Sequence, residues 1–439
     1  MFLSSHPRRR VGSLLLAASL MLAAPASAEV GRNGVDKDDW LPLTPDIGAP
    51  MPDDPFLDTD DCPFAQELPP AFDADALPAR GQDAPTPVPV ELPGPGGADL
   101  DTCGEVAASG MTIPEDLSLG AFSVFDIDSG EVLAAKDPYG LHRPASIIKA
   151  LLLLTAIDEL DLQQNIPVSD EAANVDGSRV GIGTGGRYTA RQLLLGLVMR
   201  SGNDAAIALA EAMGGQDETV IKMQDLAYSL GATSTRVMTV HGLDSPGVQT
   251  TAYDMSLIYQ AVFQNETALD LLGTESMDFP GFDDFEGFEL SSDNPLLFSY
   301  PGTIGGKTGF TDNARHTFAV GAERDGRRLG VVLLNSTIAG GRPYEQAEKL
   351  LDAGFDTPDD ASVGELVAVS QDDAADPDAA AKAESAKSAD SADTVDGAAD
   401  PDSTASPDGV DVRVVVAVVL IVVLLGAAAF AGAKFRRRG

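Results

Sequence analysis

Metal ligands are scarce in this chain of 439 residues. It contains two cysteines, Cys62 and Cys103, and four histidines. The cysteines do not form a Cys-x-x-Cys pair, and the histidines are not spaced as ligands. The sequence therefore argues against a metalloenzyme, and we expect no metal and no cofactor.

Positive charge is also scarce. Lysine and arginine together number 29 against 68 aspartates and glutamates, which gives a formal net charge of −39. Such a balance repels nucleic acid, so we expect no nucleic-acid partner. Much of the acidity lies in residues 29–111 and 357–413, which are rich in alanine, aspartate and proline. We interpret them as an extended arm and a disordered tether, both solvated and self-repelling, rather than as cation-binding segments.

The N-terminus has the pattern of an export signal. Residues 8–10 are arginines, an apolar run covers 11–24, and 26–28 read Ala-Ser-Ala, a pattern that signal peptidase cleaves after. Residues 1–28 are therefore predicted to be a signal peptide. An uncleaved anchor is the alternative, but the run is short for a membrane span. In an exported chain, two cysteines favour one disulfide over two free thiols.

The C-terminus has the pattern of a membrane anchor. Residues 414–433 form an uncharged apolar run of the length that a bilayer core requires, and the basic segment 434–439 follows it. Basic residues favour the cytoplasmic side, so the tail is predicted to be cytoplasmic and the chain before the span extracytoplasmic. The sequence thus predicts a single-pass protein of the cell membrane, with the lipid bilayer as a partner. A buried core helix is the alternative, but nothing folded follows it to bury it.

Residues 112–356 have the periodicity of a globular domain. Strands are expected at 121–127, 131–135, 318–322 and 329–334, with turns at 128–130 and 325–326. Helices are expected at 150–157, 191–200, 205–213, 218–230, 253–263 and 345–353. The candidate N-caps are Thr189, Asn203 or Asp204, Asp217, and Thr250 or Thr251. Strands, then helices, then strands that return to the same sheet indicate an α/β (α+β) fold with an antiparallel sheet flanked by helices.

A Ser-x-x-Lys motif opens the helix expected at 150–157. Pro144 suits the first turn of a helix and not its interior, so it leaves Ser146 near the N-terminal end. Residues three apart on a helix are neighbours, so the amine of Lys149 can reach the hydroxyl of Ser146. This pair has the form of a nucleophile with a base beside it.

Two later triplets support a catalytic interpretation of this motif. Ser201-Gly202-Asn203 and Lys307-Thr308-Gly309 follow in the order, and at roughly the separations, that accompany Ser-x-x-Lys in β-lactamases and penicillin-binding proteins. The stretches 241–244, 250–255 and 305–311 add to the pattern. On these motifs, residues from about 112 to 356 resemble the D-alanyl-D-alanine carboxypeptidases, the low-molecular-mass penicillin-binding serine peptidases.

The resemblance implies a fold, an activity and partners. The fold would be that of the serine β-lactamases and transpeptidases, with a mainly helical subdomain beside the sheet. The activity would be removal of the terminal D-alanine from peptidoglycan stem peptides, with β-lactams as inhibitors. Ser146 would be the acyl-enzyme nucleophile and Lys149 its base, an amine that must be neutral to act and whose pKa a second cation, Lys307, would lower.

The resemblance also assigns the remaining motif residues. Ser201 would relay protons between the base and the leaving amine, and Asn203 would hold the substrate amide. Lys307 and Thr308 would bind the terminal carboxylate, with Gly309 completing that triplet along a strand at one edge of the site. The backbone N–H of Phe310 would join that of the nucleophile in an oxyanion hole.

Three features depart from the family pattern. Many relatives carry Ala-Gly where this chain has Ala314-Arg315, which adds bulk and charge near the site. Their second, β-rich domain has no counterpart after Phe355. Their amphipathic C-terminal helix is replaced by a full span.

Three alternatives differ in chemistry. A class A β-lactamase shares the three motifs but needs a deacylating glutamate, commonly in a Glu-x-x-Leu-Asn element, and no such element stands between Ser201 and Lys307. A non-catalytic wall-binding module has no need for a nucleophile and its base. A Ser-His-Asp hydrolase would be expected to show a Gly-x-Ser-x-Gly elbow, which this chain lacks.

Overall fold

A computed structural model describes residues 57–368, except 73, 80, 81 and 91. The predicted signal peptide at 1–28, the span at 414–433 and the tail at 434–439 lie outside the described residues, as do parts of the arm and of the tether. Within the described part, no helix combines the length and the apolar character that crossing a membrane would need.

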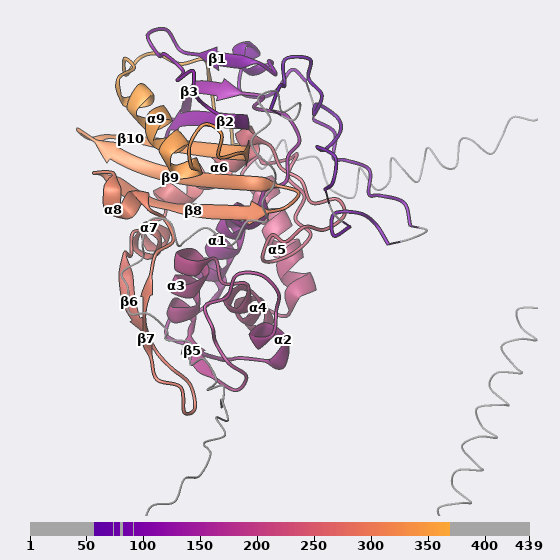
Figure 1. The fold of residues 1–439 in the computed structure, drawn as a ribbon, viewed down its shortest axis with the longest axis vertical. Helices are drawn as coiled ribbons and strands as arrows, with labels where there is room; N and C mark the ends of the chain where they lie inside the picture. The colour runs from indigo at the N-terminus through magenta and orange to yellow at the C-terminus, as the bar shows by residue number, and fades with distance from the viewer. Residues whose placement is uncertain (1–56, 73, 80–81, 91, 369–439) are drawn as a thin grey trace, which may run out of the picture. The chain divides into compact units, whose positions relative to one another are not determined.

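A seven-stranded antiparallel sheet forms the upper half of the view in Figure 1. Its strands run in the order β1-β3-β2-β10-β9-β8, with β11 also pairing with β3. Their bounds are β1 Glu105–Ala107, β2 Leu119–Asp126, β3 Glu131–Lys136, β8 Thr303–Thr311, β9 Arg315–Arg324, β10 Arg327–Ser336 and β11 Gly364–Glu365. The expected strands and their two hairpin turns are confirmed, and the turn between β9 and β10 places Asp325 and Gly326 at positive φ.

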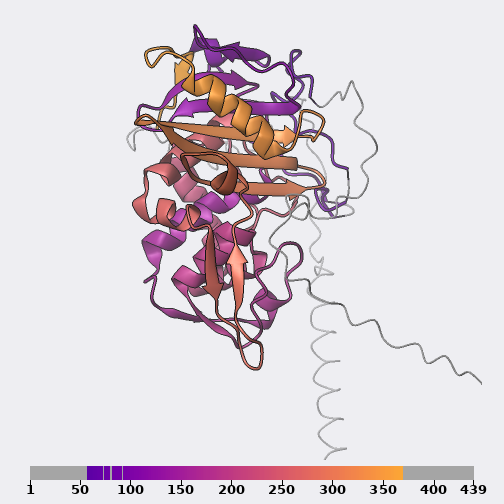
Figure 2. The ribbon, with the colours of Figure 1, turned by 60° about the vertical axis from the view of Figure 1, so that its left-hand side comes forward.

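Helices cover both faces of the sheet. Their bounds are α1 Lys149–Glu159, α2 Asp170–Ala173, α3 Ala190–Arg200, α4 Asn203–Ala212, α5 Gln216–Ser229, α6 Ala252–Gln264, α7 Glu266–Leu272, α8 Leu296–Ser299 and α9 Pro343–Phe355, with 3₁₀ turns η1 Ala98–Leu100 and η2 Ala145–Ile148. Figure 2 shows α9 lying across one face. Because strand side chains alternate, Phe122 and Val124 pack with α9, whereas Ala121 and Phe125 join the larger core that contains α1 and α6.

A mainly helical region adjoins the sheet. It contains α2, α3, α4 and α5, together with the small sheets β4 Asn165–Pro167 with β5 Arg187–Thr189, and β6 Ser276–Phe279 with β7 Phe288–Ser291. Its apolar residues are continuous with the core under the main sheet. The predicted fold class, an antiparallel sheet flanked by helices with a helical subdomain, is confirmed.

The helix caps were predicted with mixed success. Thr189 and Thr251 are N-caps whose side chains accept hydrogen bonds from the third residue of their helices, as expected. The predictions for Asn203 or Asp204 and for Asp217 were wrong. Glycines, Gly202 and Gly215, precede α4 and α5 instead, and they provide no side-chain cap. Asn203 and Asp204 have tertiary partners in the candidate site, which explains why they do not cap the helix.

Ordered structure extends beyond residues 112–356 on both sides. β1 pairs with β3 through residues 105–107, and β11 pairs with the same strand through Gly364 and Glu365. The hydroxyl of Tyr253 donates to Glu365 O at 3.0 Å and accepts from Val367 N at 2.9 Å. The sheet therefore includes residues from segments that the sequence assigned to the arm and the tether.

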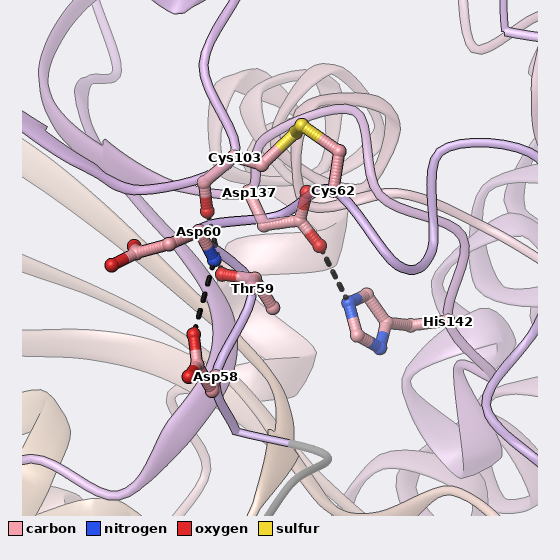
Figure 3. The surroundings of a disulfide bond; sticks show 7 residues. All are labelled: Asp58, Thr59, Asp60, Cys62, Cys103, Asp137 and His142. Atoms are coloured by element: carbon pink, nitrogen blue, oxygen red, sulfur yellow. Dashed lines mark hydrogen bonds and ion pairs between the residues drawn. A yellow bond between two sulfur atoms is a disulfide. The ribbon is translucent and has the colours of Figure 1, made fainter.

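A disulfide closes a loop within the arm, just before strand β1. Cys62 and Cys103 are bonded, as favoured from the sequence, across a separation of 41 residues (Figure 3). Beside it, Thr59 Oγ1 donates to Cys103 O at 2.5 Å. The arm also bonds to the sheet through Lys136, whose Nζ donates to Leu57 O at 2.8 Å. Near the disulfide, Figure 3 also shows a buried contact between Asp137 and His142, with His142 Nε2 3.4 Å from Asp137 Oδ2.

Loss of the disulfide is expected to destabilise the protein measurably. A crosslink that closes a loop of this length removes conformational freedom from the unfolded chain, so Cys62→Ala/Cys103→Ala should lower the free energy of unfolding by about 2–4 kcal/mol. Urea denaturation of the oxidised protein and of the double variant measures the difference. Equal unfolding midpoints with equal slopes would contradict this role.

Candidate active site

The candidate nucleophile lies on a strained turn. Ser146 belongs to η2, the 3₁₀ turn between Pro144 and α1, so it precedes the α-helix proper. Its neighbour Ala145 has φ +47°, a conformation that costs energy for a non-glycine residue. Gly242 presses against this turn, because a Cβ added there would lie 2.2 Å from Ala145 O. The 241–244 segment therefore supports the turn that presents the serine.

The amine of Lys149 lies at the centre of a hydrogen-bond cluster. Its Nζ is 2.7 Å from Ser146 Oγ, 2.8 Å from Asn203 Oδ1 and 2.6 Å from the backbone oxygen of His241. Ser201 Oγ is more distant, at 3.4 Å. The side chain is 1% exposed. The structure thus brings together the serine, the lysine and both functional residues of the second triplet.

Burial and a second cation favour the neutral form of this amine. Burial lowers the pKa of Lys149 well below its usual range, the positive charge of Lys307 lowers it further, and Asp293 and Asp204 act in the opposite direction. Burial also lowers the pKa of Lys307, which Asp293 partly offsets. An uncharged amine 2.7 Å from a hydroxyl can accept its proton, so the geometry allows general-base activation of the serine.

The second triplet lies between two helices. Ser201 adopts a left-handed conformation, with φ +56°, as the C-cap of α3, and it lines the cavity in front of the nucleophile. Asn203 begins α4 and is 2% exposed. Its Nδ2 donates to Asp176 O at 2.7 Å while its Oδ1 accepts from Lys149, so both ends of the amide bind the protein. In this structure Asn203 therefore orients the lysine and the loop before α3. Its expected contact with the substrate amide stays a prediction.

Asp204 is a structural residue of the site that sequence reasoning had treated only as a helix cap. Its carboxylate accepts hydrogen bonds from the backbone N–H groups of residues 180, 181 and 182, at 3.0, 2.8 and 3.2 Å. The loop that it holds carries Ser178 and Arg179, which line the cavity. A buried carboxylate bound by three backbone donors fixes this wall of the site. The sequence held no signal for these partners, because they come from a different loop.

The third triplet lies on the edge strand β8, as predicted. Gly309 allows the strand to approach the nucleophile, because a Cβ there would lie 3.0 Å from Ser146 N and 2.3 Å from Thr317 Oγ1. Phe310 follows, paired in register with His316, and their rings are 4.7 Å apart. The backbone N–H groups expected to form an oxyanion hole are thus carried by two chain segments in close contact.

Lys307 and Thr308 both contact an acidic residue that sequence reasoning missed. Thr308 Oγ1 donates to Asp293 Oδ2 at 3.0 Å, and Lys307 Nζ lies 3.9 Å from the same oxygen. Lys307 also donates to Thr308 O at 2.8 Å, and its side chain is 3% exposed. The ammonium is therefore almost fully buried. Asp293 stands outside every motif, so this contact could not be predicted from the sequence.

The cavity in front of Ser146 has a volume of about 280 Å³. Its polar lining includes Ser201, Thr308 and two cationic side chains, Arg179 and Arg200. Aromatic and apolar residues complete it: Phe310, Phe318, Pro343 and Tyr344. Within the described part of the chain, no three histidine, cysteine or acidic side chains are grouped as a metal site would require.

The charge of Arg315 is directed toward the arm. From the sequence, this residue is expected to add bulk and charge near the site. In the structure its guanidinium lies over the ring of Phe72, 5.2 Å from the centroid, and Arg315 is not among the cavity-lining residues. The backbone N–H of Phe72 also donates to Asn313 Oδ1 at 2.5 Å. The arginine that departs from the family pattern thus contacts the N-terminal arm.

Comparison with known proteins points to one family. The family model for D-alanyl-D-alanine carboxypeptidase matches residues 109–337. The chain is 45% identical over 247 residues to D-alanyl-D-alanine carboxypeptidase DacB2 of Mycobacterium tuberculosis, covering 55% of this chain and 84% of that protein. It is 30% identical over 234 residues to D-alanyl-D-alanine carboxypeptidase DacF of Bacillus subtilis, covering 52% and 60%.

Solved structures agree with the sequence matches. The crystal structure of D-alanyl-D-alanine carboxypeptidase from Mycobacterium tuberculosis H37Rv superposes with a TM-score of 0.57 at 42% identity, covering 60% of this chain and all of that one. Penicillin binding protein 6B from Escherichia coli gives a TM-score of 0.51 at 29% identity, covering 56% and 80%.

The charge of Lys307 should set the pH dependence of the reaction at Ser146. A lysine that acts as a general base must be neutral, so with Lys149 in that role the rate should rise with pH through the pKa of this amine. Lys307→Gln removes a charge that lowers this pKa, so the ascending limb should move to higher pH, and kcat/KM near neutral pH should fall about 30-fold or more. Pre-steady-state acylation rates measured across pH test the shift. Lys307→Arg keeps the charge and is the matched control. An ascending limb that stays in place in the glutamine variant would contradict the coupling.

Proposed function

Because the chain belongs to the D-alanyl-D-alanine carboxypeptidase family of serine peptidases, we propose that it removes the terminal D-alanine from peptidoglycan stem peptides through an acyl-enzyme on Ser146. One observation carries the proposal for the site. The buried amine of Lys149 lies 2.7 Å from the hydroxyl of Ser146, in surroundings that favour its neutral form. A lysine so placed can take the serine proton as the hydroxyl attacks a peptide carbonyl.

The proposed reaction assigns a step to each motif residue. Lys149 accepts the proton of Ser146 during attack, and the backbone N–H groups of Ser146 and Phe310 stabilise the developing oxyanion. Ser201 passes a proton toward the leaving D-alanine. Water then hydrolyses the acyl-enzyme, with the lysine again as the base. Asn203 holds Lys149 in position, and its amide becomes available to substrate only by giving up a contact that it makes in this structure.

Substrate binding in the proposal uses the third triplet. Lys307 and Thr308 recognise the terminal carboxylate of the stem peptide, and Gly309 lets the strand lie against the nucleophile. A β-lactam offers an amide and a carboxylate in a similar arrangement, so penicillins are proposed to acylate Ser146 and to inhibit the enzyme.

The proposed location is the outer face of the cell membrane. The support comes from the sequence: the export signal pattern at 1–28 and the uncharged run at 414–433 followed by basic residues. A single span would hold the catalytic domain near its polymeric substrate. Protease accessibility in intact cells, with and without residues 414–439, tests this part of the proposal independently of catalysis.

A β-lactamase is the second candidate function, and the two differ in deacylation. The described residues place two histidine rings near the site, but burial lowers the pKa of both His241 and His316 to about 4, so both rings are weak bases at neutral pH. Nδ1 of His241 accepts a hydrogen bond from Leu243 N at 3.2 Å. With no Glu-x-x-Leu-Asn element in the sequence, we expect a penicilloyl-enzyme that persists.

Release of free D-alanine is the direct test. Full-length protein in detergent micelles should release D-alanine from a muropeptide ending in D-Ala-D-Ala and should be labelled by a fluorescent penicillin at one site per chain. Ser146→Ala should abolish both, because it removes the nucleophile. Ser229→Ala, at the end of α5, is the control and should leave both intact. Persistent stoichiometric labelling of Ser146→Ala would sink the assignment. Rapid loss of label from the unmodified enzyme would instead favour the β-lactamase.

A further inference from the structure

Asp293 contacts both functional side chains of the carboxylate-binding triplet. It lies between β7 and α8, and its backbone N–H donates to Met199 O at 2.8 Å, which fixes the loop to the end of α3. Its Oδ2 accepts from Thr308 Oγ1 at 3.0 Å and lies 3.9 Å from Lys307 Nζ. The ammonium and hydroxyl that we propose for the substrate carboxylate thus already contact a carboxylate of the protein.

The other oxygen of this carboxylate is poorly satisfied. Asp293 Oδ1 has almost no exposed surface and accepts no hydrogen bond from any residue in the described ranges. By contrast, Asp204, another carboxylate of the site, receives backbone N–H donors on both oxygens. A buried acceptor without a donor is unfavourable, so the position of Asp293 gives less stability than its two contacts suggest. The side chain is 16% exposed and lines the cavity, so it has space into which it can move.

We propose that Asp293 occupies the place of the substrate's terminal carboxylate in the free enzyme and so determines specificity for the C-terminal group. The inference rests on the proposed function, in which Lys307 and Thr308 bind that carboxylate. Two carboxylates repel one another when they share one ammonium and one hydroxyl, so a peptide acid must displace Asp293. A peptide whose C-terminus is an uncharged amide meets no such competition. The enzyme therefore favours free acids over uncharged C-termini less than it would with Lys307 and Thr308 alone.

A nearby cation makes the displacement feasible. Arg200 lines the same cavity at the end of α3, and its charge adds a small contribution to the lowering of the Lys307 pKa, which is caused mainly by burial. A displaced Asp293 carboxylate can pair with this guanidinium, while Lys307 and Thr308 turn to the substrate. Asp293 acts in this scheme as a specificity-determining residue and takes no part in bond breaking.

The test compares a peptide acid with its amide. Asp293→Asn keeps an oxygen that can accept from Thr308 Oγ1 but removes the charge. With an N-blocked peptide ending in D-Ala-D-Ala, the ratio of kcat/KM for the peptide acid to kcat/KM for its C-terminal amide should rise about tenfold in the full-length variant. The ratio is the readout because loss of the Asp293 charge also lowers the pKa of Lys149, and that effect acts on both substrates alike. Glu289→Gln removes one negative charge from the exposed part of β7, four residues earlier, and is the matched control that should change neither rate. Asp293→Ser, which also lacks the charge, should reproduce the split if the asparagine variant folds poorly.

Each outcome bears on one claim. A rise in the acid-to-amide ratio supports the proposal. Equal changes for acid and amide, in either direction, or no change in either, would overturn it, because a structural brace or an effect on Lys149 acts on both substrates alike. D-Alanine release by the unmodified enzyme that is lost in Ser146→Ala establishes the proposed function regardless of Asp293, so the two claims can fail separately.

Discussion

Two lysine amines buried close together are the constraint on which this site depends. Lys149 is 1% and Lys307 2% exposed. Two ammonium groups in such surroundings are unfavourable, and release of one proton relieves the cost of burying both charges. The hydrogen-bond partners of Lys149 are neutral oxygens, whereas Lys307 has a carboxylate within 3.9 Å. The surroundings therefore assign the lost proton to Lys149, the amine that lies beside the serine.

The rest of the fold holds this arrangement in place. The serine and its lysine stand at the start of α1, which is buried between the sheet and the helical region. The strand β8 brings Lys307 to the same point only because Gly309 permits close contact with the serine turn. Asp204 fixes the opposite wall through backbone donors of a loop about 22 to 24 residues away in sequence. Residues far apart in the chain thus define one cavity, and the sheet provides the rigid frame that the geometry requires.

Local sequence signals predicted much of this, and tertiary contacts account for the rest. Thr251 caps its helix and the Asp325-Gly326 turn joins its strands because both depend on neighbouring residues alone. Asn203 was mistaken for a cap because its partners, Lys149 and Asp176 O, come from elsewhere in the chain. The arm and the first residues after α9 were assigned to solvated segments because of their average composition. An average does not reveal the individual residues that pack against the domain. Leu100, for example, is fully buried. Asp293 belongs to no motif, and its importance comes only from its contacts.

The most direct measurement of the central claim is the titration of the Lys149 side chain itself. Protein labelled with ¹³C at the lysine ε-carbons gives a resonance for each lysine. The resonance of Lys149 is identified as the one that disappears in Lys149→Arg. The account predicts that this resonance titrates well below the ordinary lysine pKa of about 10.4 and that its pKa rises in Lys307→Gln. An amine that titrates in the ordinary lysine range in the folded enzyme would contradict the assignment of Lys149 as a neutral base.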